Sequence, residues 1–225
     1  IPNVFRKFFA EGAFSQAFIP IYSEYIGSKD DKGSQDFLNA LFGILLSALF
    51  IFTALALLFA PIFILIFAPG FYFDIQKQDL AVSLLRIMFP YLALISLVAF
   101  AAGIQNSHNK FSIPAITPLI FNLSLIGSAW LVAPKIDIPV MALAWGVLLA
   151  GFLQLLFQIA PLATIKKIPI PKIDFQNPGV KKFFILILPA IVAGGIAQIH
   201  LLIDTIFASV LITGSPTWPY VSDIL

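Results

Sequence analysis

The 225-residue chain has no cysteine and only two histidines, and only 11% of its residues are charged. Without cysteine it has no disulfide framework, no thiolate nucleophile and no cysteine-ligated metal. It also lacks a Walker A loop, a dinucleotide-binding glycine motif and the H-E-x-x-H and G-x-S-x-G sequences. We therefore expect no enzyme active site, no organic cofactor and no nucleic-acid partner.

What remains is strongly apolar. Hydrophobic residues make up 60% of the chain and the mean hydropathy is +1.00, whereas a soluble domain is about half apolar and a quarter charged. A membrane-spanning helix needs about 20 mainly apolar residues. Six segments qualify: 3–26, 38–67, 80–104, 113–133, 139–163 and 183–212. We predict an all-α fold, a polytopic bundle of about six transmembrane helices, with the second span bent at Pro61.

The lysines predict how the bundle is oriented. The connections after spans one, three and five carry eight of them: Lys29, Lys32, Lys110, Lys166, Lys167, Lys172, Lys181 and Lys182. The connections after spans two and four carry only Lys77 and Lys135. Because cytoplasmic loops of membrane proteins are enriched in basic residues, the first set is predicted to face the cytoplasm. The chain also opens without methionine inside a patterned segment, so we expect a fragment of a longer protein.

The opening span combines apolar residues with Asn3, Arg6, Lys7 and Glu11. At about 100° per residue these four fall within one sector of roughly 140°. Charge within the membrane is costly and usually faces a protein interior or a water-filled cavity. These four residues therefore predict a helix that lines a substrate cavity. The alternative is that Arg6 and Lys7 reach the outer interface while Lys7 pairs with Glu11 one turn later.

Three further polar groups stand out within predicted spans. Asp204, with His200 one turn earlier, is a candidate cation or proton site. The alternative for Asp204 is an ordinary hydrogen bond or a hydrated position near the end of a long helix. Gln154 and Gln158 share one helix face, and we interpret them as hydrogen-bonding contacts between helices rather than as cavity residues.

The opening residues, Ile-Pro-Asn-Val-Phe-Arg-Lys-Phe-Phe-Ala-Glu-Gly-Ala-Phe-Ser-Gln-Ala-Phe-Ile-Pro, resemble the signature of the MurJ (MviN) family of bacterial lipid II flippases. Later stretches agree in order and spacing: Ala68-Pro-Gly-Phe, Phe89-Pro-Tyr, Gln105-Asn-Ser-His-Asn-Lys-Phe-Ser-Ile-Pro-Ala, Ala142-Leu-Ala-Trp and Asp204-Thr-Ile-Phe-Ala-Ser. The resemblance implies the two-lobed fold of the multidrug/oligosaccharidyl-lipid/polysaccharide exporter superfamily. Residues 1–163 would be helices two to six of the first lobe, 164–182 a basic cytoplasmic loop, and 183–225 the truncated first helix of the second lobe.

The same resemblance implies a function. Such a protein flips lipid II, the undecaprenyl-diphosphate-linked peptidoglycan precursor, across the bacterial inner membrane for cell-wall synthesis. Arg6 would be one of the cavity arginines that hold the diphosphate, and Asp204 would bind Na⁺ as a coupling ion. A family arginine expected after Tyr220-Val-Ser-Asp223 is replaced by Ile224. Expected partners are lipid II, membrane lipids and proteins of cell-wall synthesis. The alternatives are an exporter of drugs or of another lipid-linked sugar, and a non-transporting scaffold of cell-wall assembly.

Overall fold

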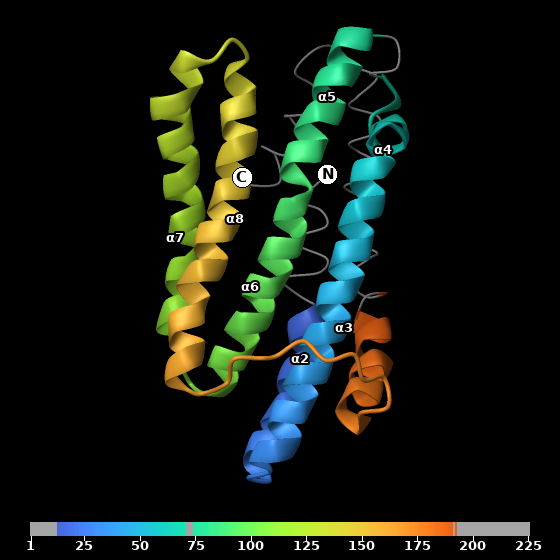
Figure 1. The fold of residues 1–225 in the computed structure, drawn as a ribbon, viewed down its shortest axis with the longest axis vertical. Coiled ribbons are helices and arrows are strands. Elements are labelled where there is room, and N and C mark those ends of the chain that lie inside the picture. Colours follow the sequence, from blue (N-terminus) through green and yellow to red (C-terminus); the bar gives the residue numbers. More distant parts are fainter. Residues whose placement is uncertain (1–12, 71–73, 191, 193–225) are drawn as a thin grey trace.

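The computed structural model describes residues 13–70, 74–190 and 192. Within these ranges the main elements are α2 (Ala13–Gly27), α3 (Asp31–Leu58), α4 (Ala60–Phe67), α5 (Ile75–Met88), α6 (Pro90–Ser107), α7 (Ser112–Gly127) and α8 (Pro139–Thr164). A π turn, Ser128–Val132, and a 3-10 turn, Ala133–Lys135, extend α7. A further helix covers 178–190. The predicted all-α class is confirmed (Figure 1).

Four described helical stretches are long and apolar enough to cross a membrane. They are Asp31–Leu58, Ile75–Ser107, Ser112–Lys135 and Pro139–Thr164. These stretches coincide with the second to fifth predicted spans. The first and sixth predicted spans lie only partly within the described residues, so the total of six stays a prediction.

Prolines interrupt two of the predicted spans. Helix α3 ends at Leu58 and α4 begins at Ala60, with Pro61 in its first turn, because proline has no N–H and its ring clashes with the carbonyl four residues earlier. The bend expected at Pro61 is therefore found as a helix break. Pro90 separates α5 from α6 in the same way, which was not predicted. The two helices stay end to end because Phe89 keeps helical dihedrals, φ −62° and ψ −39° (Figure 1).

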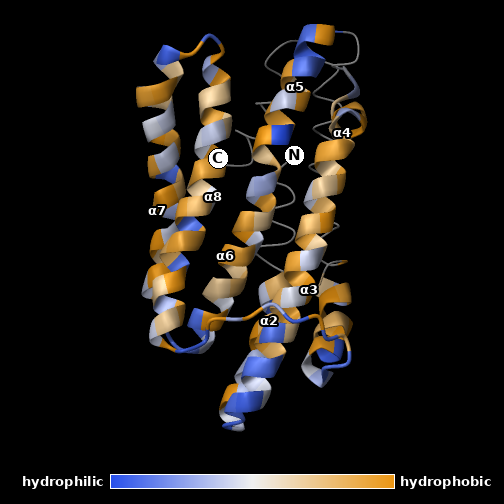
Figure 2. Cartoon of the chain, in the orientation of Figure 1, coloured by the Kyte–Doolittle hydropathy of each residue, from blue (hydrophilic) through white to orange (hydrophobic). Residues whose placement is uncertain are grey.

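The helices run up and down, so alternate connections gather at opposite ends of the bundle (Figure 1). The turns 28–30 and 108–111 and the segment 165–177 share one end; five of the eight predicted cytoplasmic lysines lie within them, and the other three follow them within five residues. Lys77 and Lys135 belong to elements of the other end. Figure 2 shows hydrophilic residues towards these ends and apolar residues along the shafts between them. The charge asymmetry thus follows the fold, and its orientation toward the cytoplasm stays a prediction.

Helix α6 is central and packs against α2, α3, α5, α7 and α8. One buried apolar cluster joins α2, α3, α6 and the 178–190 helix. A second joins α3, α4 and α5, and a third joins α6 to the α7–α8 hairpin. Small residues allow close approach, as in other membrane helix pairs: a Cβ added at Gly151 of α8 would lie 2.8 Å from the Tyr91 ring of α6.

Candidate functional site

The residues predicted to line a cavity or bind a cation, Asn3, Arg6, Lys7, Glu11 and Asp204, all lie outside the described residues. Their roles stay predictions. The structure does show how the helix that follows the first four is held. It also shows a polar cluster at the lysine-rich end of that helix.

Helix α2 is anchored by aromatic side chains on one face. Phe18 stacks between Tyr22 of the same helix and Phe37 of α3, with ring centroids 5.3 and 5.9 Å away. Its ring also meets the edge of Phe100 on α6, at 5.3 Å. Phe14, one turn earlier, lies 5.5 Å from Phe183 of the 178–190 helix. Such aromatic pairs add about 0.5–1.5 kcal/mol each beyond simple burial, so this face fixes α2 against three neighbours.

The opposite face of α2 is exposed and partly polar. Gln16, Pro20 and Glu24 follow one another at four-residue intervals and are all exposed. The same helix thus combines an anchored aromatic side with an exposed side.

At the lysine-rich end, the buried Tyr22 hydroxyl lies 3.0 Å from Nε2 of His108, the residue that ends α6. Burial lowers the pKa of His108 from its ordinary value of 6.5. The Lys167 ammonium group lowers this pKa further, and the Asp31 carboxylate opposes both effects. At neutral pH the imidazole is therefore uncharged and is held by a hydrogen bond from α2 to the end of α6.

Lys167 is a buried charged residue that sequence reasoning missed. Its side chain is only 9% exposed, and its Nζ donates to Asp31 Oδ1 at 2.5 Å and to Ser34 Oγ at 2.9 Å. Asp31 and Ser34 belong to the first turn of α3, whereas Lys167 follows α8. A buried ammonium group needs such partners because its desolvation is costly. The neighbouring Lys166 is exposed, and nothing in the sequence distinguishes the two lysines.

Residues 165–177, which we call the strap, cross from α8 to the 178–190 helix along the side of α3 (Figure 1). The Asn39 side-chain oxygen accepts from the Ile170 amide at 2.8 Å, and the Asn39 carbonyl accepts from the Lys172 amide at 3.1 Å. Gln35 donates to the Ile168 carbonyl at 3.1 Å. The strap is thus bound to α3 mainly through its backbone.

The strap approaches α3 most closely at Gly43. A Cβ added there would lie 2.4 Å from the Lys172 carbonyl oxygen. Gln35, Asn39 and Gly43 follow at four-residue intervals and so lie on one helix face. This polar and small stripe in an otherwise apolar span was the sequence signal that could have located the strap.

The strap leads into a helix that is attached to α2. Lys182 donates to the Glu24 carboxylate, and Val180 and Phe183 are buried in the cluster shared with α2. Gly179 is also tightly packed, since an added Cβ would lie 2.6 Å from the Phe37 ring. The first turns of this helix therefore belong to the same packed unit as α2 and α3.

A second polar network lies deeper, between α6, α7 and α8. Gln158 donates to Thr117 Oγ1 at 2.9 Å, and Gln154 donates to the Thr117 carbonyl at 3.0 Å. Gln105 of α6 donates to the Gln158 side-chain oxygen. All four side chains are buried. The interpretation of Gln154 and Gln158 as contacts between helices is confirmed.

Among the described residues, no group of three or more histidine, cysteine, aspartate or glutamate side chains could hold a metal ion. The described polar clusters join helices to one another through the hydrogen bonds given above. They set the position of the candidate substrate helix and the path of the strap.

The model of the family described as "Lipid II flippase MurJ" matches residues 1–225. The chain belongs to the MurJ family. It is 40% identical over 225 residues to the probable lipid II flippase MurJ of Buchnera aphidicola subsp. Acyrthosiphon pisum, covering all of this chain and 44% of that protein. It is 39% identical over 232 residues to the Haemophilus influenzae counterpart, covering all of this chain and 46% of that protein.

Two further similarities agree with this assignment. The lipid II flippase MurJ of Burkholderia cenocepacia is 37% identical over 229 residues, with all of this chain and 44% of that protein covered. A solved structure titled "Lipid II flippase MurJ, inward closed conformation" superposes with a TM-score of 0.80 at 28% identity, covering 99% of this chain and 45% of that one. The predicted resemblance and the helical membrane-transporter fold are confirmed. The chain spans less than half the length of these MurJ relatives.

Proposed function

We propose that this chain is part of a flippase that moves lipid II from the cytoplasmic to the periplasmic leaflet of the bacterial inner membrane. The observation that carries the proposal is the MurJ family match over residues 1–225. It is supported by the fold similarity, with a TM-score of 0.80, and by the apolar helices that make this a membrane protein.

The physical task of such a flippase is to move a diphosphate and its sugars across hydrocarbon. Guanidinium groups replace the hydration of the diphosphate with charge-assisted, often bidentate hydrogen bonds. The lipid tail stays in the bilayer while the headgroup occupies a hydrated cavity. Two lobes that rock against each other expose this cavity first to one side and then to the other.

Within this mechanism we assign substrate contact to Arg6, supported by Asn3, Lys7 and Glu11 on the same sector of the predicted helix. In the full-length protein, Arg6→Ala should fail to complement loss of the flippase. Arg6→Lys should restore growth only in part, because lysine lacks the bidentate fork. Gln16→Ala, on the exposed face of α2, serves as the matched control. Normal growth of the Arg6→Ala strain at native expression would contradict the assignment.

Lipid II accessibility at the outer leaflet should be measured in the same strains. The full-length wild-type protein is expected to restore both growth and outward movement of lipid II. Growth without lipid II movement would favour a scaffold, and movement of another lipid-linked sugar in its place would favour a related exporter.

Asp204 is proposed to bind Na⁺ and to couple it to transport, because a carboxylate within a membrane span is a cation site by default. Sodium should raise the thermal stability of the full-length protein relative to potassium and choline, and Asp204→Ala should abolish the difference. An identical response in wild type and variant would make Asp204 a structural residue only.

The orientation can be tested with single cysteines, since the chain contains none of its own. Cysteine at position 135 should react with an impermeant maleimide on intact spheroplasts, and cysteine at position 172 should not. The reverse pattern would place the lysine-rich end in the periplasm.

A further inference from the structure

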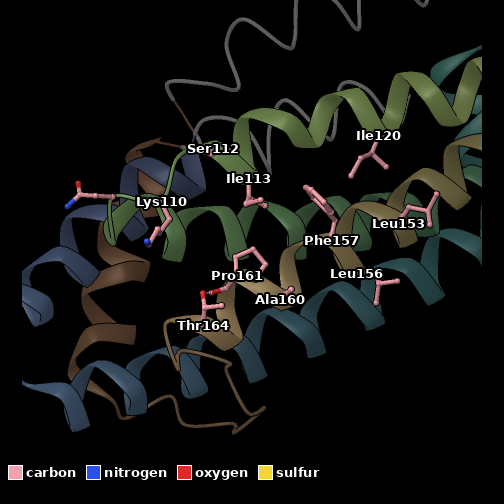
Figure 3. A pocket seen from close by; sticks show the side chains of 11 residues that line it. Lys110, Ser112, Ile113, Ile120, Leu153, Leu156, Phe157, Ala160, Pro161 and Thr164 are labelled. Atoms are coloured by element: carbon pink, nitrogen blue, oxygen red, sulfur yellow. Dashed lines mark hydrogen bonds between the residues drawn. The ribbon is translucent and has the colours of Figure 1, made fainter.

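A groove runs along the outer side of the α7–α8 hairpin. Its volume is about 1020 Å³, at the upper end of the roughly 300–1,000 Å³ typical of ligand pockets. Its walls are apolar, with Ile120, Leu153 and Phe157 along the two helices (Figure 3). Leu153 and Phe157 remain 41% and 37% exposed. Both helices are long and apolar enough to cross a membrane, and in that position the groove lies in the layer where lipid chains pack.

The groove is polar at one end only. Asn109, Lys110, Ser112 and Thr164 line this end, and none of the described residues that line the groove is acidic (Figure 3). Asn109 follows the His108 cap of α6 and lies in the left-handed region at φ 58°. The Lys110 amide then donates to the Gln105 carbonyl at 2.9 Å, which fixes the turn. Within the described part of the chain, Lys110 makes no ion pair, so its ammonium group is available to an anion at the mouth.

The length of the groove matches one leaflet. Its α8 wall runs from Leu153 to Thr164, which at 1.5 Å per residue is about 16 Å. The hydrocarbon core of a bilayer is about 30 Å thick, so the groove extends across about half of it. Its polar mouth lies in the turn at the lysine-rich end of the bundle.

We propose that this groove binds an acidic phospholipid, with the phosphate at Lys110 and an acyl chain along the wall formed by α7 and α8. A cation at the headgroup level and an apolar channel one leaflet long match the two parts of such a lipid. The lipid belongs to the leaflet at the lysine-rich end, where acidic lipids attract each lysine by about 1 kcal/mol. The proposal depends only on membrane insertion and not on the transported substrate.

The test uses the full-length protein in phosphatidylcholine nanodiscs that contain a small fraction of phosphatidylglycerol with a photoreactive acyl chain. Cross-linked peptides are located by mass spectrometry. Labelling should be stronger at Ile120, Leu153 and Phe157 than at Phe50 and Ile51, which are 74% and 59% exposed on α3 and do not line this groove. Unlabelled phosphatidylglycerol should compete, and phosphatidylcholine should not.

Two matched lysine substitutions at opposite ends of the hairpin complete the test. Lys110→Gln should lower labelling of the groove about fivefold, whereas Lys135→Gln, at the far end of the same hairpin, should leave it unchanged. Equal labelling in both variants would overturn the proposal. Absence of label from the groove, with α3 still labelled, would show that a helix from outside this chain fills it. Displacement by lipid II but not by phosphatidylglycerol would assign the groove to the transported lipid.

Discussion

Replacing Lys167 with methionine should loosen the strap. Methionine keeps most of the buried aliphatic stem and removes only the ammonium group. The change removes one hydrogen bond to Ser34 and one ion pair to Asp31. Ser34 Oγ still donates to the Asp31 carbonyl at 2.9 Å, so no donor is left without a partner there.

The magnitude follows from the exposure of each contact. The hydrogen bond to Ser34 is buried and contributes about 1 kcal/mol. Asp31 is 90% exposed, so solvent screens the ion pair and it adds little. Because its donor is charged, the buried hydrogen bond to Ser34 can contribute up to about 2 kcal/mol, and a loss of about 1–2 kcal/mol corresponds to a factor of about 5–30 in a local opening equilibrium.

Hydrogen exchange on the full-length protein measures this opening at the Ile170 and Lys172 amides, which donate to Asn39. Both amides should exchange about 5–30 times faster in Lys167→Met. The matched control is Lys166→Met, because Lys166 is exposed and should change stability by no more than about 0.5 kcal/mol. If the two variants exchange at the same rate, the Lys167 contacts do not hold the strap.

Three further substitutions test the packing. Gly43→Ala should lower the unfolding temperature because its Cβ would meet the strap backbone at 2.4 Å, whereas Gly27→Ala, with nothing within 4 Å, should not; equal melting curves would refute the close contact. Gln158→Leu should destabilise the bundle by about 0.6–1.7 kcal/mol, measured by thermal unfolding, and an unchanged midpoint would show that its network contributes nothing. The neutral His108 stabilises the fold fully above its ordinary pKa of 6.5, and this contribution is lost as the pH falls through its lowered folded-state pKa. His108→Gln should therefore flatten this part of the curve of stability against pH. An unchanged curve would assign the pH dependence to other groups.

Hydropathy located the second to fifth spans because a span must be apolar over its whole length, and a window of about 20 residues averages out local irregularities. The ends of the helices did not follow from hydropathy in the same way. Helix α3 begins at Asp31, seven residues before the predicted position 38. Its Asp30 cap, which accepts from the Gly33 amide at 2.8 Å, is polar and therefore invisible to a hydropathy window. The break at Pro90 was not predicted, because the apolar segment continues across it and the two helices remain end to end.

The polar joints were only partly predictable. Gln154 and Gln158 were identified because an amide within a span must find a partner. Lys167 was not identified, because it lies in a basic loop in which the sequence gives every lysine the same interpretation, a charge at the membrane surface. Its burial depends on long-range contacts with Asp31 and Ser34 of α3, and no pattern around Lys167 itself specifies them.

The strap also constrains how a rocking mechanism can operate. The family resemblance implies that this loop connects two lobes, and such a loop usually suggests a flexible tether, but Asn39 binds it to α3 along part of its length. Val180 and Phe183 then continue the core of α2 and α3 into the next helix. Any rotation of a second lobe that preserves these contacts must therefore begin beyond Phe183. Within the described helix the natural position is Pro189, whose missing N–H leaves the Ile185 carbonyl without its usual helical donor.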